Sequence, residues 1–333
     1  MALATPTIGE VNHETKALPR WLHWWAIVPV LAAFPLLLLG AEVTTHQVGM
    51  VDSEGLRPPL HLFEVGKEKI EEGNTGFLIE HSHRTFGWLV GTCSIVLAVG
   101  LGFGQRNALL RWLGAACLAG VCLQGVLGIY RVNLNAQGLA FIHGCFAQLV
   151  FALLVGTAYL TGIRENESNF ETHKDVESDS KLQRLAFLTM AMIYVQVVFG
   201  AIVRHTEFAW GPRLHLVLAF VVTTLVVGLW LTYQNERGFA RMRRPLTVLV
   251  IILGFQLLLG VEAWMSKFAT PQWNQLKPLI GNLTYRDMPR SVHALLGALL
   301  FADSVVVALA SRLNVSPGLV RQPVTLSNQE VAL

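Results

Sequence analysis

Acidic, imidazole and guanidinium groups stand together at the start of one apolar segment. The segment Glu80–Arg84 reads Glu-His-Ser-His-Arg, and residues 85–103, which follow it, contain no charged side chain. That run is about long enough to cross a bilayer as a helix. Ionisable groups at membrane depth are costly, so they usually belong to functional sites. Because imidazoles can bind a metal and a carboxylate can move protons, this segment is a candidate site.

Three further histidines, His143, His215 and His293, recur at the starts of later apolar runs. Together with His83 they alternate along the chain, so helices that start on one side of a membrane would carry all four at similar depth. Two histidines from facing helices can occupy both axial positions of a haem iron in a four-helix bundle. The alternatives are histidines that only cap or hydrogen-bond at helix heads, and zinc, which is weaker because structural zinc prefers four close ligands, often with cysteine.

Glu80 lies three residues before His83, so a helix would place both side chains on one face. His81 would point about 200° away from His83, which favours His83 as the ligand and leaves His81 as a supporting group. The position three residues before His215 is Pro212, so the second half of the chain has no matching acid. Glu80 is therefore the predicted catalytic residue, either shuttling protons or stabilising a developing cation. The alternative role is an acid that offsets a helix dipole.

The composition is that of an integral membrane protein. Hydrophobic residues make up 53% of the chain and charged residues 14%, against roughly 25% charged in a typical soluble domain. Mean hydropathy is +0.49. The net charge is only +3 and no basic tract is present, so we expect no nucleic acid partner.

The apolar runs predict an all-α membrane protein with eight transmembrane helices in two pseudo-symmetric four-helix bundles. We expect an N-terminal bundle over residues 21–162 with the substrate haem site, and a C-terminal bundle over 183–312 with a haem b site. The tails 1–20 and 313–333 and the polar linker 163–182 complete the chain. Pro289 is expected just before the last helix. The predicted spans are 21–40, 82–103, 109–130, 139–162, 183–204, 212–234, 245–265 and 291–312.

Lysine and arginine are moderately enriched in one set of short loops, which places both termini in the cytoplasm. The segments on the other side are then 41–79, 131–138, 205–211 and 266–290. The first of these is long for a connector, so we expect it to cover the N-terminal site as a lid, with a short helix near Val65–Glu72.

Glutamines precede glycines by four residues in three of the spans, which puts amide and glycine on one helical face. The glycine allows close approach of a flat ligand or a neighbouring backbone, and ordinary helix packing in lipid is the alternative. The pairs are Gln124 with Gly128, Gln196 with Gly200, and Gln256 with Gly260.

Arginines near the predicted outer ends could pair with haem propionates through the forked guanidinium. The alternative is that they reach toward the membrane surface. They are Arg84, Arg131, Arg204 and Arg290.

These residues resemble the haem A synthase family over about residues 20–312. The resemblance lies in Glu80-x-x-His83-Arg84, in the glutamine–glycine pairs, in the segment QVVFGAIVRHT at 196–206, and in the later histidines. It implies two similar four-helix bundles and oxidation of a methyl group of haem O to a formyl group, giving haem A for cytochrome c oxidase.

The resemblance also implies roles for the site residues. His215 and His293 would bind the iron of a haem b cofactor. His83 and His143 would face the iron of the substrate haem O, with Arg84 also contacting that haem and Glu80 as the essential carboxylate. Many bacterial members carry a cysteine pair in the first outer loop, whereas residues 41–79 contain no cysteine, so no thiol relay runs through that loop.

Two other functions stay open: a non-catalytic membrane cytochrome b that carries electrons, and an assembly factor that delivers haem. For the enzyme, the expected partners are haem O and the enzyme that makes it, a membrane electron donor such as quinol, and the lipid bilayer. A homo-oligomer is left open. The expected location is a bacterial plasma membrane.

Overall fold

The chain folds into long helices along almost all of the described sequence. The structure is a computed structural model that describes residues 18–49, 51, 73–104, 107–163, 177–236, 239–268 and 283–313. Within these ranges there is no strand, and eight helices are long and apolar enough to span a membrane. The helices are α1 (Arg20–His46), α3 (Thr75–Gly104), α4 (Ala108–Leu134), α5 (Gln137–Thr161), α6 (Glu177–His205), α7 (Gly211–Asn235), the short η3 (Ala240–Met242), α8 (Arg243–Phe268) and α11 (Leu283–Arg312). The predicted fold class, an all-α membrane protein with eight spanning helices, is confirmed.

Several helices extend past the predicted spans, because hydropathy falls at the first charged residues while backbone hydrogen bonding continues. The α3 helix begins at Thr75, about two turns before residue 82. At this start, the Asn74 side chain accepts a hydrogen bond of 3.0 Å from the Phe77 amide. Likewise α1 continues to His46, so helix occupies both ends of the expected 41–79 loop. Pro289 was wrongly expected before the last helix and lies inside α11. The expected helix near 65–72 lies outside the described residues.

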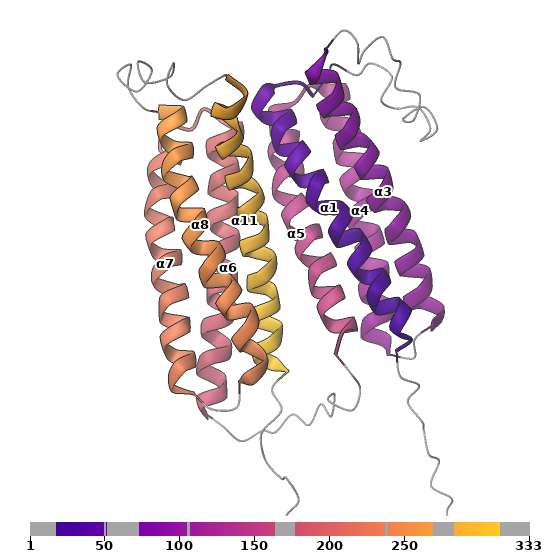
Figure 1. Ribbon diagram of the computed structural model, residues 1–333, viewed down its shortest axis with the longest axis vertical. Coiled ribbons are helices and arrows are strands. Elements are labelled where there is room, and N and C mark those ends of the chain that lie inside the picture. Colours follow the sequence, from indigo (N-terminus) through magenta and orange to yellow (C-terminus); the bar gives the residue numbers. More distant parts are fainter. Residues whose placement is uncertain are drawn as a thin grey trace, which may run out of the picture.

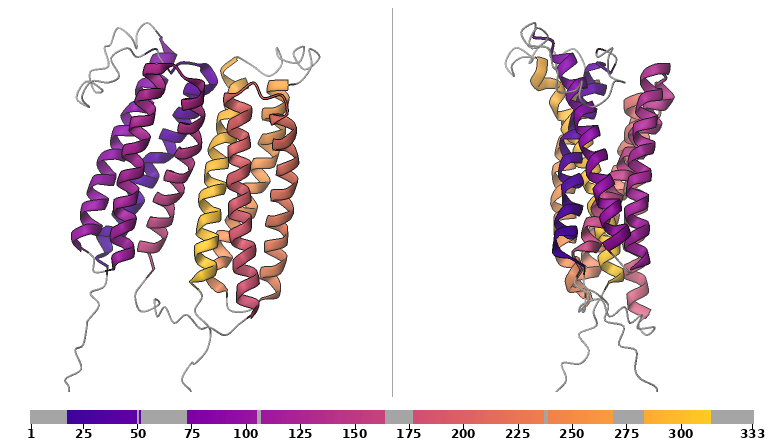
Figure 2. Two further views of the ribbon diagram at one scale, coloured as in Figure 1. Left: turned by 180° about the vertical axis from the view of Figure 1, so that it is seen from behind. Right: turned by 90° about the vertical axis from the view of Figure 1, so that its right-hand side faces the viewer.

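The helices pack in two groups of four (Figures 1 and 2). In the first helix group, α3 packs against α1 and α4, and α5 packs against α4 and α1. In the second helix group, α6 packs against α7 and α11, and α8 packs against α7 and α11. The beginning of α1 and the end of α11 lie at the same end of the molecule (Figure 1). The functional division into two domains and the pseudo-symmetry of the groups stay predictions.

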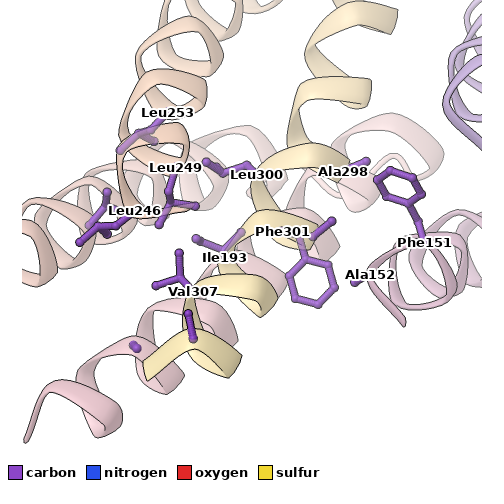
Figure 3. Packing of buried hydrophobic residues seen from close by; sticks show 14 of the residues in the cluster. Phe151, Ala152, Ile193, Leu246, Leu249, Leu253, Ala298, Leu300, Phe301 and Val307 are labelled. Atoms are coloured by element: carbon purple, nitrogen blue, oxygen red, sulfur yellow. The ribbon is translucent and has the colours of Figure 1, made fainter. Parts of the chain in front are cut away.

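The two groups meet along an inter-group seam, where α11 contacts α5 and α1 and α6 contacts α5. In its apolar part, Phe151 and Ala152 of α5 lie against Ala298 and Phe301 of α11 (Figure 3). All four side chains are buried. Small residues beside aromatic ones let the two helices approach closely, so the seam is a packed contact.

Candidate functional site

The four histidines lie in the amino-terminal parts of α3, α5, α7 and α11, all at the same end of the molecule. Their side chains come from two helices of each group. His83 and His293 lie deeper from their helix starts than the expected one or two turns, because α3 and α11 begin earlier than hydropathy indicated. The alternation of the spans therefore brings the four histidines to the same end of the molecule, and their common depth stays a prediction.

Each histidine ring packs against a glycine of the preceding spanning helix. A Cβ atom on Gly40 would lie only 2.8 Å from Cε1 of His83, a separation that real Cβ atoms essentially never show. A Cβ atom on Gly200 or Gly260 would lie 3.1 Å from the imidazole that it faces. Glycine at these positions therefore leaves space for the imidazole ring, and a larger side chain would fill that space. The four pairs are Gly40 with His83, Gly128 with His143, Gly200 with His215, and Gly260 with His293.

The predicted glutamines contact the same histidines. Gln196 Nε2 donates to the backbone oxygen of His215 at 2.9 Å and lies 3.5 Å from its Nε2 atom. Gln256 Nε2 lies 3.4 Å from Nε2 of His293. In the first helix group, Gln124 Nε2 donates to the backbone oxygen of the facing histidine at 2.9 Å. The amide and the glycine thus form two sides of one histidine pocket, which the sequence pattern alone left undecided.

His83 is held differently, because Leu36 stands one turn before Gly40 where the other helices have glutamine. His83 Nδ1 donates to the backbone oxygen of Leu36 at 3.0 Å. A carbonyl can only accept, so Nδ1 carries the proton and Nε2 keeps its lone pair. This is the common orientation of a metal-binding imidazole, fixed by a backbone carbonyl on its other nitrogen.

His215 and His293 form the better-defined pair. Their ring centres lie 6.3 Å apart at an interplanar angle of 81°. Two imidazoles on opposite sides of one metal ion, each bound at about 2.0–2.1 Å, have ring centres roughly 6.3 Å apart. The Nδ1 atoms of both rings are buried without a hydrogen-bond partner among the described residues. The spacing of the two rings therefore fits an iron held from two sides.

The corresponding histidines of the first helix group are His83 on α3 and His143 on α5. His205, the last residue of α6, lies on the same side: its Nε2 atom is 3.4 Å from where a Cβ atom of Gly144 would be, next to His143. The family resemblance includes His205 in the QVVFGAIVRHT segment but gives it no role. Its place beside His143 follows only from the packing of α6 on α5.

Glu80 is buried and held at both carboxylate oxygens. Arg84 Nη2 donates to Oε1 at 2.6 Å, and the backbone amide of Val51 donates to Oε2 at 2.6 Å. Arg131 of α4 also attracts it electrostatically. Two hydrogen-bond donors and a second nearby guanidinium therefore surround this one carboxylate. Val51 belongs to the segment expected to cover this site, so part of that segment does reach Glu80.

His81 turns away from the His83 pocket. Its ring stacks on Phe77 of the same helix, with centres 5.3 Å apart and planes 22° from parallel. The distinction between the two histidines of the motif therefore agrees with the helical period. The assignment of His83 as a ligand stays a prediction.

The arginines at this end of the molecule make different contacts. Arg84 binds Glu80, whereas Arg204 crosses the inter-group seam to α1. Arg131 interacts electrostatically with His83 and His143. Contact of these arginines and Arg290 with propionates stays a prediction.

Among the described side chains, no cluster of three or more histidine, cysteine or acidic residues could hold a metal ion. Each histidine pair therefore offers two protein ligands. A porphyrin, which supplies four nitrogens of its own, suits such a pair better than a bare ion does.

Fold and site together define a polytopic helical membrane protein with paired histidines at one end. The chain belongs to the COX15-CtaA family of cytochrome oxidase assembly proteins, whose model matches residues 1–155 and 61–210. This confirms the resemblance to the haem A synthase family. No curated protein and no solved structure matches the chain. The protein is therefore an integral membrane protein with a role in cytochrome oxidase assembly.

Proposed function

We propose that the protein oxidises a methyl group of haem O to a formyl group, producing haem A for cytochrome c oxidase. Family membership supports an enzyme of this class. The observation that carries the proposal is Glu80, a buried carboxylate one turn from His83 in one half of the chain, with Pro212 at the equivalent position of the other half. This difference between the two halves is expected if one site performs chemistry and the other transfers electrons.

In the second helix group, we propose that His215 and His293 would hold the iron of a haem b cofactor. Such a haem would supply one-electron transfer. The chain's own part is to hold both rings against Gly200 and Gly260, so that their orientation is set before the cofactor binds.

In the first helix group, His83 and His143 are proposed to hold the substrate haem O, with Arg84 beside it. Conversion of the methyl to the formyl group adds one oxygen and removes two hydrogens. With water as the oxygen source, four electrons and four protons leave, and two molecules of a two-electron oxidant, such as a membrane quinone that becomes quinol, would take them up. Glu80 is placed to accept protons or to balance positive charge that develops on the substrate. Its bonds to Arg84 and to the Val51 amide keep the carboxylate fixed during that step.

The remaining partners follow from this chemistry. The enzyme that makes haem O would deliver the substrate, and a membrane carrier such as quinol would exchange electrons with the haem b site. We further propose a bacterial plasma membrane with both termini in the cytoplasm. A homo-oligomer is compatible with this arrangement.

The test is co-expression with a haem O-producing enzyme, followed by mass analysis of the extracted haem. The proposal expects hydroxymethyl or formyl products from the unmodified protein and at least a hundredfold less from Glu80→Gln, because removing a positioned acid–base group typically costs about 10²–10⁴-fold in rate. A plain electron carrier or a haem-delivery factor would yield only unmodified haem. Full product yield from Glu80→Gln would exclude the proposed role of the carboxylate.

A control separates chemistry from stability. Glu80→Gln leaves the Arg84 guanidinium without its carboxylate, at a cost of about 1–3 kcal/mol in unfolding free energy. The double variant Glu80→Gln/Arg84→Gln removes both charges and should regain most of that stability. Because Arg84 is itself proposed to contact the substrate haem, the double variant is used to compare melting temperatures only. Loss of product from Glu80→Gln protein that still folds and binds haem supports a catalytic role of the carboxylate.

A further inference from the structure

A polar contact joins the two helix groups at the level of the histidines. Arg204 of α6 donates through Nη2 to the backbone oxygen of Ala41 and, at 2.6 Å, to Oγ1 of Thr45, both on α1. Thr45 Oγ1 in turn lies 3.0 Å from Oγ of Ser291 on α11, which is fully buried. One side chain thus connects three helices across the inter-group seam.

This contact is connected to a histidine pocket in each helix group by one helical turn or less of backbone. Arg204 lies one turn beyond Gly200, the glycine behind His215. On α1, Ala41 directly follows Gly40, the glycine behind His83. A shift of Arg204 relative to α1 would therefore displace the glycine walls of two pockets in different helix groups.

The contact also carries charge. The electrostatic neighbours of the Arg204 guanidinium are the cation Arg290, the acid Glu42, the cation Arg131 and the His293 imidazole. The two oxygens to which it donates are neutral, so its charge is not cancelled by direct hydrogen bonding to them. In the low dielectric of a membrane interior, such a charge acts over longer distances than it would in water.

We propose that Arg204 is a positioning residue that holds the two histidine sites at a fixed separation and supplies a cation between them. The inference rests on the proposed function, since it concerns haem bound at these histidines. A cation beside a haem iron favours the reduced form, which carries one negative charge more than the oxidised form. Arg204 thereby keeps the His215–His293 site easier to reduce.

The experiment is a spectroscopic redox titration of haem b in the purified full-length protein. Arg204→Gln keeps a hydrogen-bonding amide but removes the charge, and should shift the reduction equilibrium toward the oxidised form at least tenfold, which is about 59 mV for one electron. Arg204→Lys should stay within threefold of the unmodified protein. The matched control is Arg213→Gln, since Arg213 is exposed at the same end of the second helix group and packs on Trp210. Equal potentials for Arg204→Gln and Arg213→Gln would overturn the proposal.

If Arg204→Gln binds no haem b, the same redox titration is carried out on Thr45→Val. This variant keeps the cation and removes one of its two acceptors, so the guanidinium loses its fixed place. A shift of at least threefold in the same equilibrium is expected, and an unchanged potential would refute the positioning role. Failure of the proposed function is separately visible: the unmodified protein would then lack haem b or yield no oxidised haem product.

Discussion

At the residue scale, the glycines behind the histidines are the most exacting positions of the site. In Gly260→Ala, the new Cβ atom would lie 3.1 Å from Cε1 of His293, so the ring must move by a few tenths of an ångström. Overpacking of this kind typically costs about 1–3 kcal/mol. We expect less haem bound per protein, measured as Soret absorbance, together with a lower melting temperature.

Gly254→Ala is the matched control on the same helix, because nothing lies within 4 Å of its added Cβ atom. Alanine is favoured over glycine in a helix by about 1 kcal/mol, so this variant should be neutral or slightly stabilised with normal haem content. If both variants lost haem to the same extent, contact with His293 would not be the cause.

At the element scale, α5 and α11 are kept close by small side chains at the inter-group seam. Ala298 is buried beside Phe151 (Figure 3). Ala298→Leu would force the helices apart or side chains out of their preferred rotamers, and we expect a loss of about 1–3 kcal/mol in stability. Thermal unfolding in detergent measures the effect.

The control for this change is Ala116→Leu on α4, where the alanine is exposed on the outside of the helices. A larger apolar side chain on a lipid-facing surface should change the melting temperature little. A drop as large as that of Ala298→Leu would mean that the seam is no more tightly packed than the lipid-facing surface.

At the scale of the whole molecule, eight spanning helices place the two ends of the helical region on one side of the membrane. The lysine and arginine bias predicts that this side is the cytoplasm. A fluorescent protein fused to the C-terminus should therefore fluoresce, and alkaline phosphatase fused there should be inactive. A phosphatase fusion after Leu134, which follows three spans, should be active. The reverse pattern would invert the topology and put the histidine sites on the cytoplasmic side.

The sequence by itself determined the number of spans, their approximate places, and the end of the molecule at which the four histidines lie. Hydropathy and helical periodicity are local properties, so a single segment carries enough information for them. Helix ends were less accurate, as at residues 75 and 283, because capping and interfacial hydrogen bonds extend a helix beyond its apolar part.

Only the tertiary structure decided which groups meet. It brought Gly40 to His83, set 6.3 Å between His215 and His293, and carried Arg204 across to α1. These contacts join residues from 43 to 163 positions apart and depend on how helices are rotated and paired. Between helices in lipid, where both partners are apolar, close packing and a few polar contacts fix that pairing, and no local pattern in the chain records them.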